Sequence, residues 1–264
     1  MDLSIVIPVY NSEEIIDKLI DEIVNTIKDI NMFNSFEIIL IDDFSHDGSW
    51  TLIKDLSKKY KFIKGIKLIR NFGQHNAILA GLNECNGEKI ITMDDDLQHS
   101  PKSIKKLIDE INNGYSVCYT KYINRQHPLW KKIVSWLNNL VSSYLLNKPY
   151  NIYLSSYRCF DKKVKNEIIK YSGTRVYIDG LILKSSRNIS IIPVEHNKRI
   201  SGLSNYNFSR LLSLWADMST TFPIYPIRLA SIFRIIILLI VLSIRKILAL
   251  KNKNESLQFK ISEK

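Results

Sequence analysis

The stretch ITMDDDLQHSP, residues 91–101, ends a hydrophobic run with three adjacent carboxylates. Three like charges side by side repel one another unless a cation or water relieves them. Side chains alternate on an extended backbone, which predicts Asp94 and Asp96 on one side and Asp95 on the other. Gln98 returns to the side of Asp94 if the chain stays extended as far as that residue. Carboxylate and carbonyl oxygens suit Mg²⁺ or Mn²⁺, which take few protein ligands and share substrate phosphates. The stretch therefore indicates a divalent-cation site at the end of a strand.

A second interpretation of the same stretch is a solvated acidic turn. In that case the turn would cap a helix that begins at Pro101, with Ser100 directly before it. Calcium binding is disfavoured, because the spaced, glycine-containing loop typical of calcium sites is missing.

Strands that alternate with helices surround the acidic stretch along the front half of the chain. Short apolar runs predict strands at residues 3–9, 36–41, 62–69, 89–93 and 115–120. Helical spacing predicts helices at residues 13–30, 49–60, 74–84 and 101–112. This alternation is typical of βαβ units, so we expect an α/β fold with a mostly parallel sheet. Ligands of such sheets bind beyond the carboxyl ends of the strands, where the acidic stretch lies.

The other strand ends also carry polar segments. Asp42 and Asp43 end the second strand, where an aspartate can hold a base or ribose or can cap the helix that follows. Arg70 and His75 lie on either side of the glycine in RNFGQH, a setting for a phosphate near a helix N-terminus. A single histidine in this position is more often structural than catalytic.

Charge is distributed unevenly along the chain of 264 residues. Residues 1–100 hold 10 Lys/Arg and 17 Asp/Glu, a net charge of −7, whereas residues 101–264 hold 27 and 9, a net charge of +18. An acidic front half is unfavourable for nucleic acid, and a basic rear half suits an anionic membrane surface or phosphates. Cys85, Cys118 and Cys159 are odd in number and widely spaced, which indicates a reducing compartment and neither a disulfide frame nor a zinc site.

The rear half adds amphipathic and apolar segments. Residues 128–146 and 208–222 have the spacing of amphipathic helices with tryptophan, although ordinary core packing explains 128–146 equally well. Residues 229–244 are nearly all apolar and would span about 24 Å as a helix, so flanking residues must complete the roughly 30 Å needed to cross a bilayer. With those flanking residues, we expect a C-terminal transmembrane helix that attaches the chain to the cytoplasmic face of a membrane. Residues 1–9 show no signal peptide.

Four segments together resemble the family 2 glycosyltransferases with the GT-A fold: IVIPVYNSEE, DDFSHDGSW, RNFGQHNAILAGL and MDDDLQHSP, in order over residues 1–120. Within that family, the later RISGLSNY at 199–206 and the C-terminal apolar segment are similar to the polyprenyl-phosphate glycosyltransferases. The resemblance implies a Rossmann-like GT-A fold, a nucleotide-sugar donor, a polyprenyl phosphate acceptor, and Mg²⁺ or Mn²⁺ as cofactor. Whether the chain forms a homo-oligomer stays open.

The resemblance also implies roles for particular residues of this chain. Those expected at the nucleotide-sugar site are Pro8, Tyr10, Glu14, Asp43, Arg70, His75 and Asp95. Pro8, Tyr10 and Asp43 would hold the base and ribose. Those that match metal-binding positions are Asp94, Asp96 and Gln98, with Asp95 where relatives usually carry a small residue. The catalytic set comprises Asp94, Asp96, Arg199 near the lipid phosphate, and Arg125 as a second phosphate-binding arginine.

The expected organisation has four parts. They are a catalytic domain at 1–206, with a donor half at 1–120 and an acceptor half at 121–206, an amphipathic juxtamembrane helix at 207–227, a transmembrane segment at 228–250, and a basic tail at 251–264.

Three departures from the relatives concern the acceptor side. Asn205 stands where a lysine usually follows the serine of the GxS motif, and Ser155 and Ser156 precede Tyr157 and Arg158 where many relatives have an aspartate before the arginine. The apolar part is one short segment, whereas relatives have at least two.

The nature of the acceptor decides whether a base is needed. A lipid phosphate is already largely ionised near pH 7 and needs positive charge, whereas a sugar hydroxyl must lose a proton to a positioned base. Asp179 is the first candidate for that base, although a helix cap or a paired charge is the simpler interpretation. The preferred function is inverting sugar transfer to a polyprenyl phosphate. The alternatives are transfer to a saccharide hydroxyl in polysaccharide synthesis and an inactive relative that binds nucleotide sugar.

Overall fold

The structure of the protein is a computed structural model that describes part of the chain. The described residues are 1–31, 35–122, 139–140, 142–144, 146–173, 176–194, 231, 234–235, 237–246 and 249. The chain divides into two compact units, Met1–Thr221 and Phe222–Lys264, and each is described by itself.

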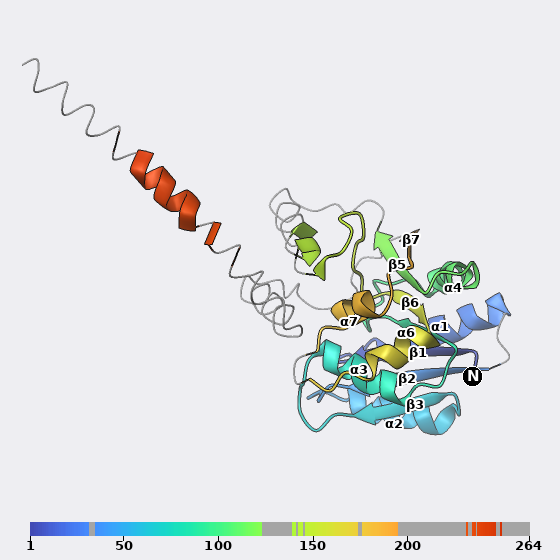
Figure 1. Ribbon diagram of the computed structural model, residues 1–264. Coiled ribbons are helices and arrows are strands. Elements are labelled where there is room, and N and C mark those ends of the chain that lie inside the picture. Colours follow the sequence, from blue (N-terminus) through green and yellow to red (C-terminus); the bar gives the residue numbers. More distant parts are fainter. Residues whose placement is uncertain are drawn as a thin grey trace, which may run out of the picture. The chain divides into compact units, whose positions relative to one another are not determined.

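A seven-stranded sheet forms the centre of the first unit, in the order β3-β2-β1-β4-β6-β5-β7 (Figure 1). The strands are β1 (Leu3–Val9), β2 (Phe36–Asp42), β3 (Ile63–Lys67), β4 (Lys89–Thr92), β5 (Val117–Tyr122), β6 (Arg158–Asp161) and β7 (Ile189–Val194). β6 runs antiparallel to β4 and β5, and the other pairs are parallel. Because β2 lies on one side of β1 and β4 on the other, the chain changes direction across the sheet between β1 and β4. Parallel sheets bind ligands at such a point.

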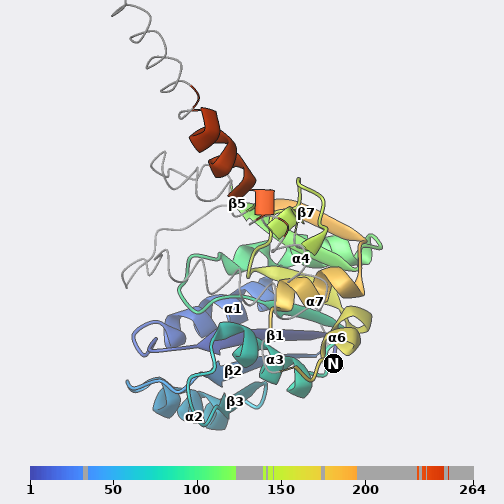
Figure 2. The same ribbon diagram turned by 60° about the vertical axis from the view of Figure 1, so that its left-hand side comes forward.

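Helices cover both faces of the sheet (Figures 1 and 2). They are α1 (Ile16–Ile30), α2 (Ser49–Lys59), α3 (Gln74–Glu84), the short η1 (Pro101–Ser103), α4 (Ile104–Asn112), α6 (Lys162–Ile168) and α7 (Ile178–Ser185). Ile5 and Ile7 of β1 belong to one apolar cluster with residues of α1, α2 and α4. Val6 points to the opposite face, where α3 approaches so closely that a Cβ on Gly81 would meet Val6 at 2.5 Å. Burial on both faces explains why β1 is an almost continuous apolar run.

The expectation of an α/β fold with a mostly parallel sheet is confirmed. The predicted helix at 74–84 matches α3, and the predicted strand at 3–9 matches β1. The helix predicted at 101–112 forms as η1 followed by α4, and Ser100 makes no side-chain capping hydrogen bond. The sequence did not predict β6, α6, α7 or β7, which complete the sheet and its second helical layer.

The second unit is described at only a few positions, among which residues 237–246 are helical. Within the described parts of the chain, no helix combines the length and hydropathy that crossing a membrane requires. The segments predicted at 207–227 and 251–264 lie outside the described residues, and the one predicted at 228–250 lies partly outside them.

Candidate functional site

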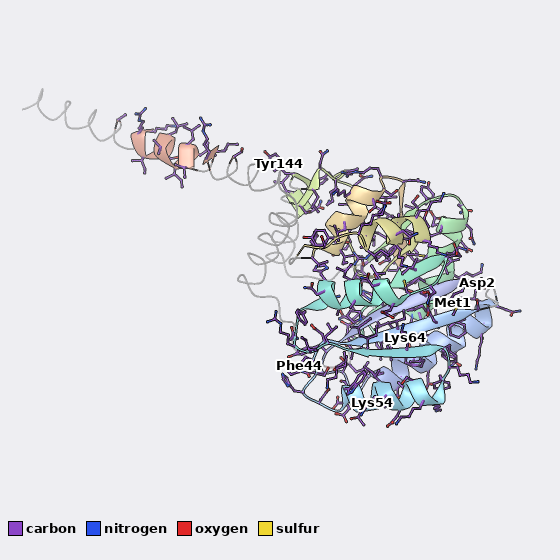
Figure 3. The ribbon with its side chains drawn as sticks, turned by 60° about the horizontal axis from the view of Figure 1, so that its bottom comes forward. Met1, Asp2, Phe44, Lys54, Lys64 and Tyr144 are labelled. Carbon is purple, nitrogen blue, oxygen red and sulfur yellow. The ribbon has the colours of Figure 1, made fainter. Side chains whose placement is uncertain are left out.

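A pocket of about 380 Å³ lies at the carboxyl ends of the parallel strands, where the order changes between β1 and β4. Figure 3 shows Phe44, which follows β2, at the end of the sheet opposite Met1 and Asp2. The ends of four strands and the loops that follow them, up to the start of α3, supply the lining residues: Pro8, Val9, Tyr10, Asp43, Asn71, Gly73, Gln74, Asp94, Asp95 and Asp96. Six of the residues predicted for the site thus line one pocket together: Pro8, Tyr10, Asp43, Asp94, Asp95 and Asp96.

Each of the four loops contains one residue with left-handed φ. These residues are Asn11 (φ 53°), Phe44 (φ 64°), Gly73 (φ 87°) and Leu97 (φ 57°). A left-handed residue turns the chain sharply, so each strand end folds back and presents its polar residues to the pocket. Glycine adopts this conformation without steric cost, but a bulky residue such as Phe44 is strained by it. Strain of this kind is typical of functional sites.

The acidic loop departs from the extended geometry that the sequence predicted. β4 ends at Thr92, the chain bends at residues 95–97, and Leu97 turns left-handed with its side chain buried. The extended backbone on which the return of Gln98 to the side of Asp94 depended is therefore absent at residues 95–97. Gln98 does not line the pocket, and its backbone N–H donates to Oδ1 of Asp96 at 3.1 Å. Its assignment as a metal ligand stays a prediction.

Asp94 is oriented by two neutral donors from distant parts of the chain. The side-chain amide of Gln74 donates to Oδ1 of Asp94 at 2.5 Å, and the hydroxyl of Ser156 donates to Oδ2 at 2.6 Å. The backbone N–H of Asp94 donates to Nδ1 of His99 at 3.3 Å. Neutral donors such as an amide and a hydroxyl fix the direction of a carboxylate without adding an opposing charge.

Asp95 bonds instead to the loop that follows β1. Its Oδ2 accepts from the hydroxyl of Ser12 at 2.5 Å and from the backbone N–H of Tyr10 at 3.2 Å. Burial from water, together with the charges of Asp94 and Asp96, raises the pKa of Asp95 to about 6, although the two hydrogen bonds oppose this increase.

Asp43 is held by the loop before α3. Its two carboxylate oxygens accept from the backbone N–H groups of Phe72 at 2.7 Å and Gly73 at 2.8 Å. Burial raises the pKa of Asp43, and these hydrogen bonds partly offset the increase. The N-cap position of α2 is Gly48, and the nearby Asp47, rather than Asp43, accepts through Oδ1 from the backbone N–H of Ser49 at 3.0 Å.

Three predicted donor-side residues lie outside the pocket lining. Glu14 is exposed, and the neighbouring Glu13 accepts from the backbone N–H of Gly48 at 2.8 Å. Arg70 is exposed and lies over the ring of Phe72, with 4.6 Å from its guanidinium carbon to the ring centroid. The third is His75, whose ring meets that of Tyr177 edge-on, with 5.1 Å between the ring centroids, as expected for a structural histidine. Arg125 and Arg199 lie outside the described residues.

The site also contains residues that the sequence did not single out. Gln74 and Asn71 belong to the quoted RNFGQH segment, so their position before α3 was a usable signal. Ser12 lies in the quoted segment IVIPVYNSEE, and Ser156 was noted only as a departure on the acceptor side. Neither pattern predicted their contacts with Asp95 and Asp94, because only the folded chain brings these hydroxyls to the acidic loop.

Asp179 is a paired charge. In the buried space between α7 and β6, its Oδ1 accepts from the guanidinium of Arg158 and from the hydroxyl of Tyr119, the latter at 3.0 Å. Arg158 also donates through Nε to Oγ1 of Thr92 at 3.1 Å. Arg158 is 1 % exposed and Asp179 8 % exposed, so the pair is shielded from water. The simpler interpretation of Asp179, a paired charge, is confirmed.

The acidic loop fits a metal ion that shares its coordination with a substrate. Within the described residues, no three or more His, Cys, Asp or Glu side chains form a group that could hold a metal by themselves. Mg²⁺ and Mn²⁺ at phosphate-transferring sites usually take one or two carboxylates and complete their shell with phosphates and water. Asp94 and Asp96 can supply the carboxylates, since both line the pocket.

Comparison with known proteins agrees with this geometry. The family described as glycosyl transferase family 2 matches residues 4–182, and the chain belongs to that family. Two relatives are called undecaprenyl-phosphate 4-deoxy-4-formamido-L-arabinose transferase. The one from Photorhabdus laumondii is 33% identical and the one from Yersinia pestis 35% identical, each over 231 residues, which are 87% of this chain and 70% of the relative. The resemblance seen in the sequence is confirmed.

Solved structures share the fold at lower identity. Glucosyl-3-phosphoglycerate synthase from Mycobacterium tuberculosis, in complex with Mn²⁺, uridine diphosphate and phosphoglyceric acid, has a TM-score of 0.61 at 17% identity, covering 83% of this chain and 78% of that one. TarS 1–349 from S. aureus in complex with UDP has a TM-score of 0.53 at 18% identity, covering 84% of this chain and 65% of that one. These likenesses concern the fold alone.

Proposed function

We propose that the chain transfers a sugar from a nucleotide-sugar donor to a polyprenyl phosphate of the undecaprenyl type. The proposal takes its acceptor from relatives named for undecaprenyl phosphate at 33% to 35% identity. Its main structural support is the charge pattern: negative carboxylates line the pocket, whereas the carboxylate best suited to act as a base is neutralised by an arginine.

The donor nucleotide occupies the pocket between the loops after β1 and β2. The ring of Tyr10 is 46% exposed and available to stack on a base, while Pro8 and Asp43 line the same pocket. The carboxylate of Asp43 accepts two backbone N–H groups, and each of its oxygens keeps a second lone pair for a base or ribose donor.

The donor diphosphate is placed against Asp94 and Asp96. Asp94 and Asp96 would hold a divalent metal, which would supply Lewis-acid stabilisation of the departing nucleoside diphosphate. Gln74 and Ser156 hold Asp94 in one orientation, so its oxygens need little rearrangement when the donor binds. Mg²⁺ and Mn²⁺ both suit this pair of carboxylates.

Transfer is a single displacement at the anomeric carbon. The bond from that carbon to the donor's phosphate oxygen breaks, a bond to an oxygen of the acceptor phosphate forms, and the nucleoside diphosphate leaves with the electron pair. A single displacement inverts the configuration. Positive charge from the basic rear half holds the lipid phosphate, with Arg125 and Arg199 as the candidates that the sequence supplies.

The state of Asp179 favours a phosphate acceptor over a hydroxyl. A general base must reach the proton it removes with a free lone pair, but Asp179 is buried, is paired with Arg158 and does not line the pocket. An ionised phosphate needs no such base. Transfer to a saccharide hydroxyl remains the second candidate, because Asp179 lies in the first turn of α7 where a rearrangement on acceptor binding could expose it.

The test is a donor screen with undecaprenyl phosphate in detergent, with mass detection of the lipid product. We expect a glycosyl phospholipid in the organic phase that disappears in EDTA and returns with Mn²⁺. A product only in the aqueous phase, with a saccharide acceptor, would overturn the proposal. The variant Asp179→Asn distinguishes the two acceptors, and for either one it should lower stability. If the acceptor is a phosphate, turnover per folded enzyme should fall only a few-fold. If the acceptor is a hydroxyl, turnover should fall about a hundredfold or more, the size of a general-base effect.

We also propose that the protein works at the cytoplasmic face of a membrane, attached through residues 228–250. Support comes from the helical residues 237–246, where the apolar side chains from Ile237 to Leu242 are 43% to 60% exposed. Truncation before residue 224 should release the protein into the soluble fraction. Persistent sedimentation of the truncated chain with membranes would assign attachment to another segment, with residues 128–146 as the first to examine.

A further inference from the structure

The three adjacent aspartates point to different partners. Asp94 accepts from Gln74 and Ser156, which belong to α3 and to the segment before β6. Asp95 accepts from Tyr10 and Ser12, both in the loop after β1. The bend at residues 95–97 separates their directions, so the triplet is not one uniform cluster of ligands.

The loop after β1 is linked to its neighbours by hydrogen bonds around the pocket. The backbone N–H of Asn11 donates to Oγ of Ser45 at 3.0 Å, and Oδ1 of Asn11 accepts from the backbone N–H of His46 at 2.9 Å. The backbone N–H of Ser12 donates to Oγ of Ser49 at 2.9 Å. These bonds join the loop to the segment that follows β2. Among the hydrogen bonds described for Tyr10, Asn11 and Ser12, those to Asp95 alone join the loop to the acidic loop.

We propose that Asp95 is a positioning residue that fixes the loop after β1, and with it Tyr10, for the donor base, and that Asp95 is not a ligand of the metal. This inference rests on the proposed donor site. Both hydrogen bonds converge on one oxygen, Oδ2, so this single acceptor links the backbone of Tyr10 and the hydroxyl of Ser12 to the acidic loop. A loop held in its binding conformation before the donor arrives binds the donor more tightly than a loop that must first be ordered.

The geometry gives a variant that separates this role from metal binding. Because one oxygen accepts both hydrogen bonds, the single carbonyl oxygen of an asparagine can replace it, so Asp95→Asn keeps the link and loses the charge. Asp95→Ala loses both. A metal ligand would behave differently, since the neutral amide is a much poorer ligand for Mg²⁺ or Mn²⁺ than a carboxylate.

The first measurement is hydrogen–deuterium exchange of the full-length chain in detergent, without ligand, on a peptide that contains Tyr10 and Ser12. We expect exchange about tenfold faster in Asp95→Ala than in the unmodified protein, and nearly unchanged in Asp95→Asn. The contrast variant Asp96→Asn should leave this exchange unchanged. Equal exchange in Asp95→Ala and the unmodified protein would overturn the proposal. If Asp95→Ala fails to fold, Ser12→Ala removes the shorter of the two hydrogen bonds and should accelerate the same peptide.

The second measurement is the affinity for UDP with Mn²⁺ as the probe, by calorimetry. We expect Asp95→Ala to weaken UDP binding about tenfold and Asp95→Asn to restore it to within about twofold, with the Mn²⁺ half-saturation concentration unchanged in both. A rise in that concentration in Asp95→Asn would identify Asp95 as a metal ligand and reject the proposal. If the unmodified protein binds no UDP, a uridine donor site is contradicted, while the exchange measurement still decides the role of Asp95.

Discussion

Two acidic regions of this protein use their carboxylates in opposite ways. At the end of β4, Asp94 and Asp95 receive hydrogen bonds from neutral donors and line an open pocket. At the start of α7, Asp179 is buried and receives the guanidinium of Arg158 together with the hydroxyl of Tyr119. The first region is oriented and keeps its charge, whereas the charge of the second is cancelled within the protein.

The two kinds of surroundings suit two different roles, ligand binding for the carboxylates after β4 and stabilisation of the fold for Asp179. Carboxylates held by neutral donors retain a field that attracts a cation and, with it, a diphosphate. A carboxylate paired with a buried arginine offers little to a ligand, and its removal leaves an uncompensated charge inside the protein. Changes in the first region should therefore affect activity with little effect on stability, and changes in the second should affect stability first.

The largest expected effect is on turnover, from Asp96→Asn. The amide keeps the shape of the side chain and removes the charge that would hold the metal, so we expect transfer to fall about 10³-fold with the fold retained. The measurement is the rate of lipid-linked product, together with circular dichroism to verify folding. Activity within tenfold of the unmodified protein would contradict metal-assisted transfer through this residue.

The second prediction concerns the buried pair. Arg158→Met removes the cation and leaves Asp179 buried without it, which should lower the free energy of unfolding by about 3 kcal/mol. Urea unfolding of the folded, full-length protein in detergent gives the measurement. The double variant Arg158→Met with Asp179→Asn is the control. It removes both charges but keeps an acceptor for Tyr119, and should recover at least about half of the loss.

These two regions were not equally visible in the sequence. The strand that precedes Asp94 is short and largely buried, and three carboxylates directly after it mark a site without knowledge of the fold. The partner of Asp179 was hidden, because Arg158 lies on β6, an antiparallel strand inserted between β4 and β5 that forms only through tertiary pairing. Local patterns thus predicted the first five strands and the acidic loop, but not β6 and β7, which complete the sheet.

The directions of the side chains within the site could not be predicted from the sequence either. The alternation of side chains holds only while the backbone stays extended, and the left-handed Leu97 ends it before Gln98. Glu14 was predicted for the donor site, but it is the equally exposed neighbour Glu13 that accepts a hydrogen bond from the backbone N–H of Gly48. Such choices depend on dihedral angles that no spacing of residue types specifies.

The third prediction tests the uncancelled charge of the acidic region through pH. Since the pKa of Asp95 is about 6 in the folded chain against 3.8 in the unfolded one, the folded state binds the proton more tightly. The contribution of this residue to stability is therefore fully present below pH 3.8 and is lost as the pH rises through 6. Allowing for partial exposure of the side chain, the loss should be about 2 kcal/mol.

Asp95→Asn isolates this contribution because the amide does not titrate. The measurement is urea unfolding in EDTA at several values between pH 4 and 7, where the onset of acid unfolding limits the acidic end. The variant should gain stability relative to the unmodified protein as the pH rises. A difference that does not change with pH would show that Asp95 carries no unfavourable charge in the folded state.

The fourth prediction tests the neutral donors of Asp94. Ser156→Ala removes the hydrogen bond to Oδ2 while Gln74 still holds Oδ1, so the carboxylate keeps its charge but not its fixed direction. We expect kcat/KM to fall about tenfold and the Mn²⁺ half-saturation concentration to rise by a similar factor. The matched variant Ser155→Ala removes a neighbouring hydroxyl that bonds Thr120 and should leave the Mn²⁺ requirement unchanged. Equal behaviour of the two serine variants would show that the direction of Asp94 does not depend on Ser156.

The smallest expected effect concerns the strain that the pocket loops carry and the buried pair does not. Phe44 holds φ at 64° with its ring 38% exposed and in edge contact with His46 at 5.5 Å. Phe44→Gly removes the clash of the Cβ, which favours the folded state, but it also loosens the unfolded chain and removes the ring contact. Phe44→Ala is the reference for this variant, because both variants lack the ring and only alanine keeps the Cβ and its strain. Glycine should therefore be more stable than alanine at this position by about 0.5–1 kcal/mol in urea unfolding, the reverse of their order at ordinary positions. If alanine were the more stable, the left-handed turn after β2 would be absent in solution, and the directions of Asp42 and Asp43 would have to be explained without it.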